Sequence, residues 1–276
     1  MELGQKSMQI LLQKLLSNIY EALPYSEATL LAGILFGDKT GFGKGFYSAL
    51  KDIGIVHIVV VSGTNVMIIA GFLIEGLTYI IGRRKSILFG LPIIWLYGIM
   101  IGLQASILRA ILLISIFYFS QLIGRKFDIW RALILTFLMV IFSDKEMFRN
   151  IGFWLSFIAF GAVILDPKWV WLWVTPILAL FFGRVSLIAP LTNAVVLFLI
   201  EVITIVGGVG VILNCKYILW LILPLLRYIT WLTNFLGGLK WVSAEIQFNW
   251  LMLIGSYLLL IWFYLKRNEK QKTVGN

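Results

Sequence analysis

The sequence predicts an all-α fold, a polytopic integral membrane helix bundle with about eight or nine transmembrane helices behind an N-terminal amphipathic region. Hydrophobic residues make up 61% of the 276-residue chain, and charged residues make up 13%. A soluble domain of this length has too much surface facing water to hide so many apolar side chains. The aromatic share of 15%, with 11 Trp, is typical of a bundle with aromatic belts at the membrane interfaces.

Composition divides the chain into three parts. Residues 1–52 form an amphipathic region in which Lys6 and Lys14 alternate with Leu and Ile, and we expect its first helix to lie along the membrane surface. No apolar core followed by a small-residue cleavage site is present there, so a cleavable signal peptide is not predicted. Residues 53–265 form the transmembrane domain, and residues 266–276 form a polar tail.

Nine apolar segments approach the length of about 20 residues that a membrane-spanning helix needs. The first contains a polar break at Ser62–Gly63, and the sequence leaves open whether its helix continues through it. The sixth is short and rich in Trp, so an interfacial or re-entrant position is an alternative for it. The seventh is long enough to tilt, or to break near Pro190 or at Gly207–Gly208. The nine segments are 54–81, 87–103, 105–123, 129–142, 151–165, 169–183, 186–213, 217–236 and 248–265.

The basic residues near the ends of these segments predict the orientation. Lys and Arg are enriched on the cytoplasmic side of membrane proteins. With nine spans, the richer side holds residues 83–85, 125–126, 168, 216 and 266–272, and the poorer side holds Lys39, Lys44, Lys51, Lys145, Arg149, Arg184 and Lys240. We therefore expect a cytoplasmic C-terminus and an outside N-terminal region. The net charge of +10 also fits a second interpretation, an anionic partner such as nucleic acid or acidic lipid.

Five ionisable side chains fall inside apolar segments, where each costs about 2.5–3.5 kcal/mol at a helix centre. They are His57, Glu75, Arg109, Glu201 and Arg227. One interpretation is structural: Arg109 pairs with Glu75 or Glu201 and holds the bundle together. The other is functional: Arg109 and Arg227 face a water-filled path and meet an anion.

Catalytic and metal chemistry is not predicted. His57 is the only histidine and Cys215 the only cysteine, which excludes multi-His zinc motifs, disulfides and multi-cysteine metal sites. Ser62 lies outside any Gly-x-Ser-x-Gly turn, and no second histidine is present to complete a triad. We expect neither an enzyme nor a resident cofactor or metal.

Five segments together resemble the membrane domain of ComEC-type competence proteins. They lie in the expected order between residues 30 and 200 and cover 31–39 (LAGILFGDK), 54–66 (GIVHIVVVSGTNV), 106–110 (SILRA), 152–159 (GFWLSFIA) and 189–193 (APLTN). One departure is Asn65, where many family members have a second histidine. The additional domains of larger members, an oligonucleotide-binding type and a metallo-β-lactamase type, are not expected here, which suggests a stand-alone core or one piece of a split system.

The resemblance implies a channel subunit in the bacterial plasma membrane that takes up single-stranded DNA during natural transformation. The resemblance implies a transport path along seven positions: His57, Ser62, Gly63, Asn65, Arg109, Ser156 and Asn193. The argument from buried charges adds Arg227 to this path. Glu75 and Glu201 would take part in charge pairing. The partners implied are single-stranded DNA, membrane lipids, a separate nuclease and other competence proteins, and a homo-oligomer is an option.

Two alternatives stay open. A small-solute or anion transporter would use a broken-helix site around Ser62–Asn65 and near Gly207–Gly208, although no internal repeat supports it. A non-catalytic membrane scaffold would pair every buried charge internally and leave no continuous wet path.

Overall fold

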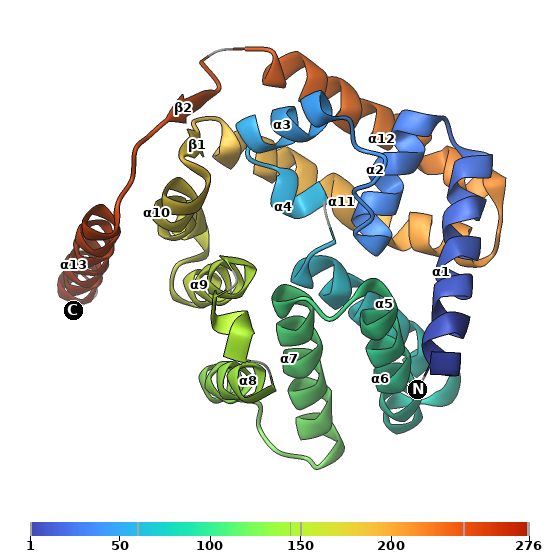
Figure 1. Ribbon diagram of the computed structural model, residues 1–276. Coiled ribbons are helices and arrows are strands. Elements are labelled where there is room, and N and C mark those ends of the chain that lie inside the picture. Colours follow the sequence, from blue (N-terminus) through green and yellow to red (C-terminus); the bar gives the residue numbers. More distant parts are fainter. Residues whose placement is uncertain (1, 60, 144, 150, 240, 275–276) are drawn as a thin grey trace.

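A computed structural model describes residues 2–59, 61–143, 145–149, 151–239 and 241–274, and these ranges are overwhelmingly helical (Figure 1). The prediction of a helical membrane protein is confirmed. Within the described residues, six helices are long and apolar enough to cross a membrane. Four shorter apolar helices accompany them, and the expected number of eight or nine spans stays a prediction.

The N-terminal part consists of four helices: α1 (Glu2–Ala22), α2 (Tyr25–Phe36), α3 (Lys44–Asp52) and α4 (Val56–Val59). In the amphipathic α1, Asn18 and Ile19 are buried while Ile10 and Leu11 are exposed. α2 is nearly all buried and ends at Gly37, whose φ of 73° lets its N–H cap the carbonyls of Ala32 and Gly33. α2 and the C-terminal end of α1 are therefore packed into the fold, and α1 has the exposed apolar face of an interfacial helix.

The middle part is a series of helices joined by short connections. It contains α5 (Gly63–Ile81), α6 (Arg83–Ile101), α7 (Ala105–Leu122), α8 (Ile129–Ser143), the 3₁₀ turn η1 (Lys145–Arg149) and α9 (Ile151–Leu165). The first predicted span is divided, because α4 ends at Val59 and α5 begins at Gly63. Figure 1 shows α4 near the centre of the molecule, between the α2, α3, α11 and α12 group and the α5 to α9 group.

The C-terminal part carries the longest helices and a small element that the sequence did not predict. It contains η2 (Pro167–Trp169), α10 (Val170–Phe182), β1 (Arg184–Ser186), α11 (Ala189–Ile212), α12 (Lys216–Gly237), β2 (Ser243–Glu245) and α13 (Trp250–Val274). The strands β1 and β2 pair antiparallel, with Arg184 opposite Glu245. α11 is continuous through Gly207–Gly208, so the second break that was considered does not form.

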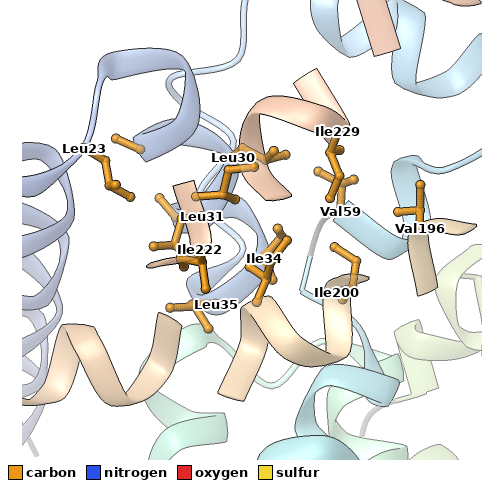
Figure 2. Packing of buried hydrophobic residues seen from close by; sticks show 14 of the residues in the cluster. Leu23, Leu30, Leu31, Ile34, Leu35, Val59, Val196, Ile200, Ile222 and Ile229 are labelled. Carbon is orange, nitrogen blue, oxygen red and sulfur yellow. The ribbon is translucent and has the colours of Figure 1, made fainter. Parts of the chain in front are cut away.

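Three hydrophobic clusters hold the described residues together. The largest joins α1 to α4 with α11 and α12, and Figure 2 shows Ile34 of α2 between Ile222 of α12 and Ile200 of α11, with Leu31 of α2 beside Ile222. The second joins α5, α6 and α7, and the third joins α7, α8 and α9. The divided segment from α4 to α5 therefore passes from the first cluster into the second.

α13 stands apart from these clusters. None of its membrane-spanning window is buried within the chain, and it packs mainly against α10 (Figure 1). The Tyr257 hydroxyl donates a hydrogen bond to the Trp173 carbonyl at 3.0 Å, and Arg267 pairs with Asp166 at 2.6 Å. The polar tail from residue 266 continues α13 to Val274.

Candidate functional site

The break between α4 and α5 is fixed by backbone contacts to α2. The Val61 N–H donates to the Gly33 carbonyl at 2.9 Å, which gives the unwound segment a partner inside the protein. A Cβ atom at Gly37 would lie only 2.6 Å from Val61 Cγ1, so the two segments can approach this closely only with glycine at that position. Non-helical backbone at membrane depth is tolerated where protein satisfies its polar groups, as α2 does here.

Ser62 and Asn65 continue this attachment at the start of α5. Asn65 is 1% exposed, and its Nδ2 donates to the Ile34 carbonyl at 2.9 Å. The Ser62 hydroxyl donates to Asn65 Oδ1 over a longer distance of 3.4 Å. The side chains of Ser62 and Asn65 are therefore engaged with each other and with α2, and they hold the divided helix in place.

Arg109 on α7 is the buried charge of the site. It is 5% exposed, its Nε donates to the Ser156 hydroxyl on α9 at 2.5 Å, and its guanidinium carbon lies 4.9 Å from the Phe160 ring centroid. Nη1 is buried and has no hydrogen-bond partner within the described part of the chain. Arg109 therefore keeps an unused hydrogen-bond donor, and its positive charge has no carboxylate partner among the described residues.

Gly63 brings the start of α5 onto Arg109. A Cβ atom at Gly63 would lie 2.8 Å from the Ser106 carbonyl oxygen and 2.9 Å from Arg109 Nη2. Any larger residue would push α5 away from the first turns of α7. Four of the predicted site residues thus form one group around the break, through the contacts Ser62–Asn65 and Gly63–Arg109, and Ser156 joins it from α9.

His57 and Asn193 lie on the α4 and α11 side of the break. α4 packs against α11, and the His57 side chain is exposed. Asn193 follows Thr192, whose hydroxyl bonds the Ile53 carbonyl at 2.8 Å and ties α11 to the start of the divided segment. The Asn193 Oδ1 atom is buried without a partner among the described residues.

The expected pairing of Arg109 with a glutamate does not form in the described structure. Glu75 bonds Arg83 instead, at 2.7 Å, because both lie near the α5–α6 turn, far along α5 from Gly63. Glu201 is exposed on α11 and makes no ion pair with a described residue. Arg227 lies on α12, where its Nε is 3.7 Å from Glu27 Oε1 of α2 and its side chain is 63% exposed, so it belongs to a different region from Arg109.

Sequence reasoning missed Phe160 and the Ile34 carbonyl as parts of the site. Phe160 follows Ser156 by four residues on α9, so helical spacing places both on one face, and that signal was available. The Ile34 carbonyl carried no signal, because any residue has a carbonyl and only the approach of α2 to α5 selects this one. Among the described residues no group of three metal-ligating side chains occurs.

A cleft with a volume of about 230 Å³ opens beside the site. It lies between α5, α7 and α9, and its lining is almost entirely apolar. Phe160 forms part of this lining and also covers the Arg109 guanidinium. Arg109 is therefore separated from the apolar cleft by one aromatic ring.

These features define a multi-pass helical membrane protein with a buried cation beside a divided helix. The family described as "Competence protein" matches residues 34–170, about half of the chain, and this range contains the divided helix, Arg109 and Ser156. Over these residues the chain is similar to the competence family.

Two curated relatives agree with this assignment. ComE operon protein 3 of Bacillus subtilis is 26% identical over 151 residues, which are 53% of this chain and 19% of the relative. Recombination protein 2 of Haemophilus influenzae is 22% identical over an alignment of 285 positions, which covers 87% of this chain and 36% of the relative. The chain thus spans about a fifth and about a third of these proteins. No solved structure matches.

Proposed function

We propose that this chain is a membrane channel subunit for the uptake of single-stranded DNA during natural transformation. The match to the competence family and the two relatives, ComE operon protein 3 and Recombination protein 2, support a role in competence. The observation that carries the more specific proposal is Arg109, a buried guanidinium without a carboxylate beside a divided helix. The proposed role is transport, without a catalytic step.

A buried charge without a counter-charge carries a desolvation cost of several kcal/mol. Proteins normally keep such a group only when it is functional, and an intramembrane arginine is functional by default. A single strand of DNA supplies one negative charge per phosphate, so a passing phosphate would satisfy the unpaired Nη1 of Arg109. The close contact of Gly63 with Nη2 places this charge at the division of the helix, where backbone is free of the regular helical pattern.

The distribution of basic residues supports a direction for this transport. The α5–α6 turn carries Arg83, Arg84 and Lys85, and the α7–α8 connection carries Arg125 and Lys126. With the nine predicted spans, the positive-inside rule assigns these turns, together with Lys216 and the C-terminus, to the cytoplasm. Gly63 and the first turn of α7 then lie toward the outside, where a strand would enter. A separate nuclease, other competence proteins and a second copy of the chain are the proposed partners.

The test is transformation by a strain whose only copy of the protein carries Arg109→Ala and Arg227→Ala. We expect marker DNA to give no transformants while the variant reaches the membrane in normal amount, measured by immunoblot of the membrane fraction. Arg184→Ala is the matched control, because Arg184 is an exposed arginine with two carboxylate partners. Normal transformation by the inserted double variant would overturn the proposal.

The divided helix also favours a second function, the transport of a small anion. Transporters commonly bind substrate where a helix is interrupted, which matches the α4–α5 break. They usually contain two such breaks, whereas α11 is continuous from Ala189 to Ile212. Proteoliposomes that take up labelled phosphate or chloride without DNA would favour the transporter over the DNA channel.

A further inference from the structure

A second cationic feature lies outside the buried site, on α3 and the loop before it. We call the α3 surface the group formed by Lys39, Lys44, Tyr47 and Lys51. The three lysines are exposed and Tyr47 is half-buried. Lys51 Nζ lies 4.7 Å from the centroid of the Tyr47 ring, which holds the ammonium group in a defined position on the helix.

The helical register directs these side chains to one side. Lys44, Tyr47 and Lys51 are spaced at i, i+3 and i+7, so they form one stripe in which the two lysine Cα atoms are about 10 Å apart. The opposite face carries Leu50, which is fully buried, and Phe46, which packs against the large N-terminal cluster. Core packing therefore fixes the outward direction of the lysine stripe.

No carboxylate neutralises this surface. None of the ion pairs among the described residues includes Lys39, Lys44 or Lys51. The two nearest acids in sequence are engaged elsewhere: Asp38 accepts hydrogen bonds from the backbone and hydroxyl of Thr40, and Asp52 accepts from Arg184 and Ser243. The surface thus presents three unpaired cations.

The first turn of α3 adds to the positive potential and is sterically open. Its N-cap, Gly43, provides no side-chain acceptor for the free N–H groups, which carry the positive end of the helix dipole. A Cβ atom at Gly43 or at Gly45 would meet no atom within 4 Å. A polyanion can therefore approach backbone and lysines together.

The surroundings of α3 distinguish this surface from a lipid-anchoring lysine. Between Tyr25 and Phe72, no described residue is an exposed large hydrophobic side chain. Lys216, at the start of α12, shows the opposite case: it lies over Tyr217 and Trp220, which are 69% and 52% exposed. Lys216 thus lies over exposed aromatic side chains of its own helix, whereas the segment that carries the α3 surface has no exposed large hydrophobic residue among those described.

We propose that the α3 surface docks a single-stranded nucleic acid through its phosphates before the strand reaches Arg109. This inference rests on the proposed uptake function and adds the place of first contact. α4, which carries His57, follows α3 after a short turn and leads directly into the divided helix. The docked strand would thus begin on an aqueous, cationic face and continue toward the buried cation.

The test is binding of a short fluorescein-labelled oligothymidine to the full chain in zwitterionic nanodiscs, measured by fluorescence anisotropy across about 50–200 mM salt. For Lys44→Gln with Lys51→Gln, we expect about ten-fold weaker binding and a salt slope smaller by about 1.4, since each lost phosphate contact removes about 0.7. Each single variant should show about half of this change in slope. Lys216→Gln is the matched control and should bind like the unaltered chain.

Two results would contradict the docking surface. Unchanged affinity and slope for the double variant, with the melting temperature of the parent, would overturn the docking surface. Unchanged oligonucleotide binding with loss of anionic lipid retained by the purified protein would assign the lysines to lipid headgroups and would equally overturn it. In either case the uptake proposal is judged separately, because Arg109 variants report on it through transformation.

Discussion

Two arginines of this protein have opposite surroundings. Arg184 in β1 is 44% exposed at its side chain and still bonds two carboxylates, Asp52 at 3.1 Å and Glu245 at 2.8 Å. The hydrogen bond that Arg184 donates to Glu245, followed by the charge of Asp52, raises the pKa of Arg184. Arg109 in α7 is buried and has one hydroxyl and one aromatic ring as neighbours.

If stability were the only requirement, the buried arginine rather than the exposed one would have the carboxylate partners. An exposed ion pair contributes little because water and salt screen it, whereas a buried charge gains most from a partner. The chain places two acids beside the partly exposed Arg184 and leaves the buried Arg109 without a carboxylate among the described residues. The surface cluster fastens β1, β2 and α3 together, whereas the proposed function keeps the Arg109 site for a partner that arrives from outside the chain.

The largest expected effect comes from removing the buried charge while keeping its volume. Arg109→Met should reduce transformation about a hundred-fold or more, since a buried charge contact of about 2.8 kcal/mol corresponds to that factor. The same change should leave the free energy of unfolding in detergent unchanged or raise it by about 1–4 kcal/mol, because the desolvation cost disappears. A loss of stability with normal transformation would show that Arg109 is structural and would remove the contrast with Arg184.

The next effect concerns the close approach at the divided helix. Gly63→Ala should destabilise the protein by about 1–3 kcal/mol, because the new methyl group would lie 2.8 Å from the Ser106 carbonyl. Gly71→Ala, on the same helix with open space around it, is the control and should be neutral or stabilising. Thermal unfolding of both variants in one detergent measures the difference, and equal melting temperatures would refute the tight contact.

A comparable or smaller effect is expected at Asn65. Asn65→Ala leaves the Ile34 carbonyl buried without a donor, which costs about 1–3 kcal/mol of unfolding free energy. Ser62→Ala removes only the longer 3.4 Å contact and should cost less. Chemical unfolding curves would decide this order, and a larger loss for Ser62→Ala would contradict the assignment of Asn65 as the main attachment to α2.

The smallest effect is expected at the exposed arginine. Arg184→Ala should change transformation little and lower the melting temperature less than the Gly63 and Asn65 variants do, because its pairs face solvent. The difference from the unaltered chain should shrink further at high salt, where the Debye length is about 3 Å. If Arg184→Ala abolished transformation in an inserted, stable protein, the surface cluster of Arg184, Asp52 and Glu245 would have to be part of the transport path.

Several features were already determined by the sequence. An apolar content of 61% and the spacing of charged turns require a helical membrane protein, since only lipid can surround so much apolar surface. Five segments in order along the chain, 31–39, 54–66, 106–110, 152–159 and 189–193, showed the resemblance to the competence family before any contact was known. The polar residues at positions 62–65 also indicated where the first span would be interrupted, although both outcomes were open.

Only the tertiary structure decided which groups meet. The carbonyl that binds Asn65 and the ring that covers Arg109 come from segments 31 and 51 positions away along the chain, and periodicity within one helix cannot specify them. The partner of Glu75 proved to be Arg83 because the α5–α6 turn brings the two together, although Arg109 was an equally good partner by charge. Hydropathy reports the preference of each side chain for water or lipid, whereas pairing depends on which helices come within a few ångströms of each other, and that is settled by packing.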